Sequence, residues 1–346
     1  MSAAPGLEEY RSLGRRSLLL LLLLLCGIGT TAVANIAIGS SGISLKDIFL
    51  VLLGGPGEGN SRMIILDIRL PMALTAAAVG AALGLGGCEI QTILRNPIAS
   101  PYTLGISSAA SFGAAVGLIL DVRSPFFPGQ ITVTASSFFF TLLSAAVLYG
   151  FSTQRYIGRN AIILFGVALN FLFNSLTMLL QYIADEDELQ SLVFWTFGSL
   201  LKATWPKLTV IAVVLAASFV ILYRRAWRLT AMTLDDAKAR SLGVPVERLR
   251  RLVLVLVSLL TAAAVCFVGT IGFIGLIAPH IARLAVGEDQ RYFMPCASLL
   301  GAFILSLAFL VSKLVIPGVI LPVGLVTAFI GIPFFLTMIV GKRRSL

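Results

Sequence analysis

Residues 70–97 read LPMALTAAAVGAALGLGGCEIQTILRNP, and this stretch decides the fold. Its first 25 residues contain one charged side chain, that of Glu89, and about 20 mostly apolar residues are enough for a helix to cross a bilayer. Gly80 and Gly84 have a spacing that allows the backbone of a neighbouring helix to approach closely. Pro97 then interrupts the helix. The stretch therefore predicts a tightly packed membrane-spanning helix that ends at a proline turn.

The rest of the chain has the same apolar character. Hydrophobic residues make up 58% of the 346 residues, charged residues only 12%, and the mean hydropathy is +0.98, which is far from the balance of a soluble domain. We expect an all-α integral membrane protein with one transmembrane domain over residues 1–346. The net charge of +10 comes from basic residues at the ends of apolar segments, which favours membrane topology over nucleic-acid binding.

Nine apolar stretches are long enough to span a bilayer. Arg15 and Arg16 precede the first and Lys342 follows the last, and positive flanks favour the cytoplasm. Because two cytoplasmic ends require an even number of crossings, we expect ten, with a short or broken one within residues 274–287. The nine stretches are residues 17–38, 70–94, 103–121, 130–152, 160–184, 205–226, 250–272, 292–315 and 321–341.

The loop charges agree with this topology. Arg155, Arg159 and the basic loop at residues 224–251 fall on the cytoplasmic side, whereas the acidic run 185–188 falls outside. The sequence therefore predicts a multi-pass membrane protein with both termini in the cytoplasm. A cleaved signal peptide ending near Ala32-Val33-Ala34 is the alternative, but cleavage would leave an odd number of crossings.

The cytoplasmic loop at about 228–249 predicts a small projection. Thr233 to Asp236 fit a helix-capping box, and Gly243 can end the helix that follows in a left-handed conformation. Pro245 suits the first turn of a second helix. Two short helices bent at a glycine would form a knob that can receive a push from a soluble partner. A basic loop that only fixes topology is the alternative interpretation.

Polar and proline residues at membrane depth are the candidates for a translocation pathway. Two glycine-rich segments broken by proline, residues 80–101 and 269–280, suggest an internal repeat around such a pathway. The side-chain amides of Asn170 and Asn174 share one face of the fifth span, because the two residues are four apart. Interhelical hydrogen bonding is their alternative role. The single histidine excludes a histidine-based metal site. The candidate pathway or gate residues are Gln91, Asn96, Pro97, Asn170, Asn174, Pro279 and His280.

Six motifs occur in order along nearly the whole chain. They are Arg69-Leu70-Pro71, Gln91 to Pro101 with Leu104-Gly105, Trp195 to Leu200, Ser241 to Val244, Gly272 to His280, and Pro322-Val323-Gly324 to Phe335. Together they resemble the permeases of ATP-driven importers for iron siderophores, haem and vitamin B12. The resemblance implies a type II ABC importer permease that forms a homodimer or pairs with a similar subunit. It also implies two cytoplasmic ATPase subunits and a periplasmic substrate-binding protein.

The resemblance assigns the knob to the ATPase partner. It implies a coupling-helix pair that bends at Leu242-Gly243-Val244, and we include Asp235, Ala239 and Pro245 in that coupling site. The chain has no GxxxxGK[ST] phosphate loop, so ATP and Mg would be bound by the partner. We therefore expect no cofactor in this chain and no enzymatic activity of its own.

Four positions depart from the family pattern. Met72 stands where the family usually has a second arginine, Phe309 and Lys313 where it has an aspartate and an arginine, and Ile320 where it has a glutamate. Basic residues toward the periplasmic face can pair with acids of the binding protein. We expect weaker or re-routed docking. The candidate docking residues are Arg62, Arg69 and Lys313.

The resemblance thus implies alternating-access import, and we rank a ferric siderophore first, haem second and a corrinoid third, in an order that follows family abundance and no residue of this chain. An ion-coupled secondary transporter is the competing class, because it also uses broken helices and would employ Glu89 as a proton-linked group. A partner ATPase would discriminate between the two.

Overall fold

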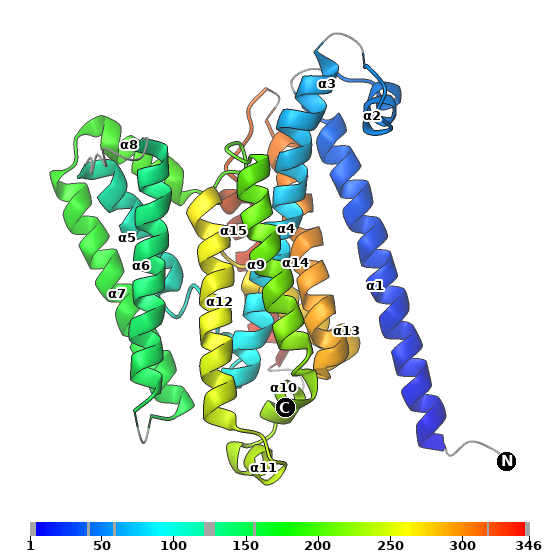
Figure 1. Ribbon diagram of the computed structural model, residues 1–346, viewed down its shortest axis with the longest axis vertical. Helices are drawn as coiled ribbons and strands as arrows, with labels where there is room; N and C mark the ends of the chain where they lie inside the picture. Colours follow the sequence, from blue (N-terminus) through cyan, green and yellow to red (C-terminus); the bar gives the residue numbers. More distant parts are fainter. Residues whose placement is uncertain are drawn as a thin grey trace.

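The computed structural model describes residues 5–39, 42–57, 60–120, 129–154, 157–316 and 318–342, and every regular element in these ranges is a helix (Figure 1). Seven apolar segments are long enough to cross a membrane. They are built from α1 (Pro5–Ala37), α3 (Ser61–Met63) with a π-helical turn (Ile64–Arg69) and α4 (Leu70–Leu94), α6 (Gly129–Ser152), α7 (Arg159–Ile183), α9 (Trp205–Tyr223), α12 (Val246–Val268) and α14 (Gln290–Leu314).

Three shorter apolar helices complete the set of ten that the sequence predicts. They are α5 (Ile106–Ile119), α13 (Ile274–Val286) and α15 (Val323–Lys342), whose apolar part runs to Thr337. The short α13 lies where the sequence requires a tenth crossing. α5 is short because Pro97 and Pro101 hold the preceding residues in turns. The remaining short helices are α2 (Leu45–Leu52), α8 (Glu186–Thr196), α10 (Ala226–Met232) and α11 (Asp236–Ser241).

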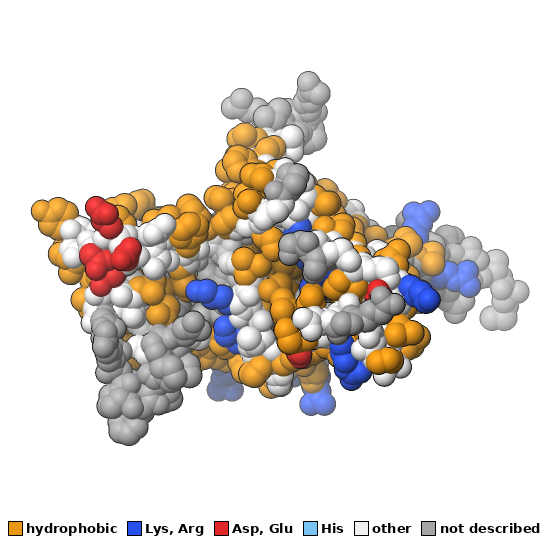
Figure 2. All heavy atoms as spheres, turned by 90° about the horizontal axis from the view of Figure 1, so that it is seen from above, with side chains coloured by type: hydrophobic (Ala, Val, Ile, Leu, Met, Phe, Trp, Pro, Cys, Tyr) orange, Lys and Arg blue, Asp and Glu red, His pale blue; other side chains and the backbone are white. Residues whose placement is uncertain are grey.

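The two ends of the described chain lie at the same end of the helix bundle. In Figure 1 the start of α1, the end of α15 and α11 lie at the bottom, whereas α2, α3 and α8 lie at the top. An even number of crossings produces this arrangement. Figure 2 looks onto the α8 end and shows an acidic patch where α8 begins with Glu186, Asp187 and Glu188. Arg155, Arg343 and Arg344, which also support the predicted topology, lie outside the described residues.

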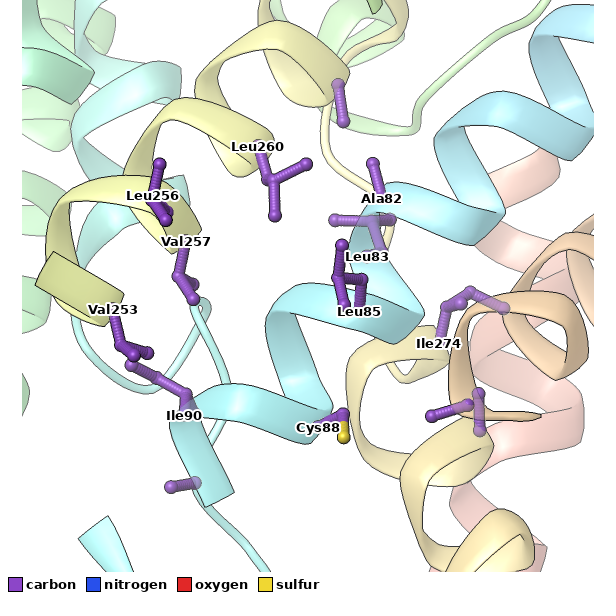
Figure 3. Close-up of a cluster of buried hydrophobic side chains, with 14 of the residues drawn as sticks. Ala82, Leu83, Leu85, Cys88, Ile90, Val253, Leu256, Val257, Leu260 and Ile274 are labelled. Carbon is purple, nitrogen blue, oxygen red and sulfur yellow. The ribbon is translucent and has the colours of Figure 1, made fainter. Parts of the chain in front are cut away.

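α4 is the central helix of the larger helix group. Every residue from Val79 to Leu94 is buried, and α4 packs against α9, α12, α13 and α14. In Figure 3 Leu83 of α4 lies between Val257 of α12 and Ile274 of α13, and Ile90 of α4 lies beside Val253 of α12. A helix that is apolar on all sides belongs in such a position, because no face of it needs water.

Glycines bring α4 and α14 into backbone contact. A Cβ atom added at Gly80 would lie 2.2 Å from the Gly301 carbonyl oxygen, and one added at Gly84 would lie 2.3 Å from that of Ala297. Gly87 makes the same kind of approach to Gly275 of α13. The close packing predicted from the glycine spacing is confirmed, and its partners are α14 and α13.

We expect Gly301→Ala to destabilise the protein. The added Cβ would lie 2.2 Å from the Gly80 carbonyl oxygen, and overpacking of this kind costs roughly 1–3 kcal/mol. The matched control is Gly29→Ala in α1, because no atom of the described residues lies within 4 Å of a Cβ built at Gly29. Thermal unfolding in detergent should show a lower midpoint for the first variant only. Equal midpoints for the two variants would contradict the contact.

Candidate functional site

The loop between α9 and α12 forms a knob, which we define as residues 233–245. Gly243 has a φ of +78°, so the predicted left-handed bend is confirmed. The predicted second short helix is wrong, because the chain continues from Val246 as the spanning helix α12 without a glycine or proline to break it. The predicted capping box is also not formed. Asp235 is the N-cap of α11, but its side chain makes no capping hydrogen bond.

The six candidate coupling residues divide by exposure. Ala239 and Val244 are buried and hold the knob together from inside. Leu242 is 64% exposed, and Gly243 and Pro245 are also exposed. Only the second group can contact another protein. Asp235 is exposed as well, but its carboxylate points to other residues of the same chain.

An ion cluster joins the knob to three helix ends. Oδ1 of Asp235 lies 3.2 Å from Nη1 of Arg95, the C-cap of α4, and 3.7 Å from Nη2 of Arg159, the first residue of α7. Oδ1 of Asp236 lies 3.8 Å from Nε of Arg159, and its Oδ2 lies 2.9 Å from Nη2 of Arg250 in α12. The sequence analysis missed this cluster, since its members are far apart in the chain.

The charges in the ion cluster change how Asp236 ionises. Partial burial raises the pKa of its carboxyl, but the hydrogen bond from Arg250 and the charges of Arg250, Arg159 and Arg240 outweigh that effect and leave the pKa below its usual value. Asp236 is therefore ionised at neutral pH and keeps its ion pairs.

A polar cavity of about 190 Å³ lies beside the ion cluster. The candidate residues Gln91 and Pro97 line it, together with Arg95, Arg283 and Glu288. Its charges are already balanced, because Nε of Arg283 lies 3.3 Å from Oε1 of Glu288 and Arg95 pairs with Asp235. Pockets for small molecules usually have roughly 300–1,000 Å³, so this cavity does not hold a bulky chelate.

Pro97 also lies close to α13 and α15. It shares an apolar crevice with Phe273, Ile277 and Phe334, and the ring of His280 lies 5.9 Å from that of Phe334. Pro279 is buried within α13. The structure therefore brings four candidates, Gln91, Pro97, Pro279 and His280, to neighbouring places around α13. The side chain of Asn96 accepts a hydrogen bond from the Ile98 amide at 3.0 Å and thus serves the turn itself.

The two asparagines of the fifth span lie apart from this group. Ser108 of α5 donates a hydrogen bond to Asn170 of α7, and Nδ2 of Asn174 donates to Oδ1 of Asn170 at 3.2 Å. The bond from Ser108 ties α5 to α7, which supports the alternative role of interhelical hydrogen bonding, whereas the bond between the two asparagines lies within α7.

Two of the candidate docking residues bind the end of α1. Nη1 of Arg69 donates to the carbonyls of Ile36 at 2.7 Å and Ala37 at 3.1 Å, and Nζ of Lys313 donates to that of Asn35 at 2.7 Å. Arg69 is only 6% exposed. Cations suit the C-terminus of a helix, where carbonyls lack intrahelical partners. Both residues thus cap α1 from other helices.

The remaining departures from the family pattern are explained in part. Nζ of Lys313 lies 4.0 Å from the ring centre of Phe309, so a cation–π contact stands where the family usually has an acidic residue. Arg62 is exposed and donates to the Gly55 carbonyl at 3.1 Å. Among the three docking candidates, it alone presents an exposed side chain.

Glu89 is fully buried in α4, so it does not occupy a solvated position near the membrane interface. Neither carboxylate oxygen has a hydrogen-bond partner among the described residues. Burying such a group without a partner is costly, so its retention here is not explained by packing.

Three sequence motifs meet at a backbone junction near the α8 end of the bundle. The amides of Val323 and Gly324 donate to the carbonyls of Gly198 and Phe197, each at 3.1 Å. A Cβ added at Gly269 would lie 2.2 Å from the Trp195 carbonyl oxygen. The sequence shows these glycines but not that they meet. The helix α8 was also missed, although Asp185 and Glu188, which form its capping box, are visible in the sequence.

Comparison with known proteins places these features in a wider group. The model of the FecCD transport family matches residues 20–341. The molybdate import system permease protein of Haemophilus influenzae is 35% identical over 321 residues, which cover 91% of this chain and 93% of that protein. The hemin transport system permease protein of Yersinia pestis is 33% identical over 282 residues, with coverages of 82% and 84%.

A solved structure agrees with these relatives. It is described as an inward-facing conformation of a metal-chelate type ABC transporter, and it superposes with a TM-score of 0.81 at 32% sequence identity. The match covers 93% of this chain and 99% of that chain.

We expect Arg69→Met to loosen the end of α1. The variant removes hydrogen bonds from a charged donor, which are worth roughly 1.5–3 kcal/mol, so the Ile38 amide that binds the Ala34 carbonyl should exchange about tenfold faster or more. Hydrogen–deuterium exchange of the peptide that contains Ile38 measures this effect. Arg62→Met is the control, since Arg62 is exposed and does not contact α1 carbonyls. Unchanged exchange in the Arg69 variant would contradict the capping role.

Proposed function

The chain belongs to the FecCD transport family, and from this premise we propose that it is the membrane-spanning permease subunit of an ATP-binding-cassette importer. In this proposal the chain lies in a bacterial inner membrane. Its α11 end faces the cytoplasm, and its α8 end faces the periplasm. The chain moves cargo inward and is not itself an ATPase.

The exposed apolar surface of the knob is the observation that carries this proposal. Leu242 and Leu234 are 64% and 43% exposed, and the charged side chains of Asp235, Lys238 and Arg240 surround them. Charged neighbours of this kind belong in water, which places Leu242 and Leu234 outside the bilayer, where they are available to contact another protein. A central apolar anchor with a polar rim is typical of a protein interface. We infer that the occupant is the ATPase subunit.

The mechanism that fits is alternating access. A loaded binding protein docks at the α8 end, and a pair of permease subunits accepts its cargo between them. Two ATPase subunits, which bind ATP and Mg, move the knobs and thereby switch the gates. Arg62 is the exposed docking candidate, while Arg69 and Lys313 preserve the shape of the docking face by capping α1.

We propose a ferric siderophore as the first cargo to test, followed by haem and then a corrinoid. The hemin permease relative and the metal-chelate type structure support a metal-bearing cargo. The molybdate permease relative adds a small oxyanion to the test, since this family is not confined to chelates. Because the described cavity is too small for a chelate, the pathway would lie between two copies of the chain.

We expect Leu242→Asp to release the ATPase. Truncating a central interface anchor typically costs roughly 2 kcal/mol or more, so the amount of ATPase that co-isolates with the permease should fall about tenfold or more. The measurement is co-purification from lipid nanodiscs with quantification of ATP hydrolysis. Leu53→Asp is the matched control, because Leu53 is 88% exposed at the opposite end of the bundle.

The bend itself provides a second test of the same proposal. Gly243→Pro replaces a φ of +78° by one near −65° and removes the amide that donates to the Arg240 carbonyl, so ATPase association should be lost. Gly54→Pro makes the same change at a glycine with a φ of +91° whose amide donates to the Val51 carbonyl. If neither the wild type nor the control retains an ATPase, the importer proposal fails.

Glu89 favours one other candidate function, an ion-coupled secondary transporter. A buried carboxyl without a partner is a common proton-linked group in such proteins. Uptake that requires a proton gradient, needs no ATPase and is abolished by Glu89→Gln would support this function over the importer.

A further inference from the structure

We propose that Asp235 is a positioning residue that links the knob to the ends of α4 and α7, so that α11 and these two helix ends move as one body. This inference rests on the proposed function, in which a partner pushes on the knob. It gives Asp235 a role inside the chain, distinct from that of the exposed leucines that face the partner.

The side chain of Asp235 is not used for capping its own helix. An aspartate at the N-cap ordinarily accepts a hydrogen bond from an amide in the first turn, but Asp235 makes no such bond. Its Oδ1 instead lies 3.2 Å from Arg95 and 3.7 Å from Arg159. The residue gives up a local bond and makes two contacts to distant helices.

The two arginines belong to different helix groups. In Figure 1, α5, α6, α7 and α8 form one group, while α4 lies with α13 and α14 on the other side of α12. Arg95 ends α4 and Arg159 begins α7. A single carboxylate therefore bridges the two groups at the end of the bundle where the knob projects.

Arg95 connects the knob to the proline turn, because it pairs with Asp235 and directly precedes that turn. It has a φ of +48°, which is uncommon for a residue other than glycine, and it immediately precedes Asn96 and Pro97. Pro97 lines both the polar cavity and the apolar crevice beside α13. A displacement of α11 that carries Arg95 with it would thus change the shape of both.

Asp235 can be altered without unfolding the protein. The side chains of Asp235 and Arg95 are 58% and 33% exposed, and exposed ion pairs contribute little to stability. The neighbouring pair of Asp236 with Arg250 is more buried, at 25% and 7%, and is the less suitable target. The chain also offers a matched control, because Arg240 and Glu247 form an exposed ion pair within the same region that reaches neither α4 nor α7.

The experiment measures the distance between two nitroxide labels, one at Lys238 on α11 and one at Ile98 in the proline turn. Both positions are exposed, and Cys26 is replaced by serine because it is the exposed cysteine of the four. Distances are recorded by pulsed electron resonance for the permease–ATPase complex in nanodiscs, without nucleotide and after trapping with ATP and vanadate.

We expect one narrow distance in both states of the wild type. In Asp235→Asn the distance should shift between states by more than the width of the wild-type distribution, with an unchanged thermal midpoint. Asp235→Glu, which keeps the carboxylate that faces Arg95 and Arg159, should keep the narrow distance. Glu247→Gln should behave as the wild type.

Two outcomes would overturn the inference. One is a narrow, unshifted distance in Asp235→Asn, and the other is an equal shift in Glu247→Gln. Loss of ATPase association in Asp235→Asn would also overturn it, because Asp235 would then contact the partner directly. Absence of any ATPase with the wild type refutes the proposed function instead, and the width of the nucleotide-free distribution still tests the linkage in the permease alone.

Discussion

The lack of water inside a bilayer is the constraint on which this structure depends. Every backbone amide and carbonyl at membrane depth must find a hydrogen-bond partner, so a helix can be interrupted only where other groups bind the freed amides and carbonyls. The junction of Gly198, Gly269 and Gly324 shows one solution, because the carbonyls freed at one break accept hydrogen bonds from amides freed at another. Breaks that occur together in this way make short helices such as α13 compatible with the bilayer.

The same constraint decides what happens at helix ends. The last carbonyls of α1 would lack donors at the edge of the bundle, and Arg69 and Lys313 supply them from two other helices. Two cations at one helix end repel each other, but each is bound to carbonyl oxygens and Lys313 also contacts the ring of Phe309. Arg69 and Lys313, which the sequence suggests as docking residues, thus bind backbone carbonyls within the protein.

The sequence predicted those features that depend on a single segment. The apolar stretches, the close packing at Gly80 and Gly84, and the left-handed Gly243 each follow from local spacing, and the structure confirms them. The ion cluster and the glycine junction depend on which helix ends become neighbours, and that is set by packing of the whole bundle around α4. One local prediction was wrong, because Pro245 starts a long helix as readily as a short one.

The two kinds of helix contact suit two different tasks. α4 meets α14 through glycine backbones, and such close packing resists sliding of one helix along the other, so we expect these helices to move together. The knob meets α4 and α7 through exposed ion pairs, which add little to stability but hold α11 to the ends of both helices. A switch needs a rigid body and a link that carries a displacement to it. The chemistry of these contacts places the rigid body around α4 and the link at α11.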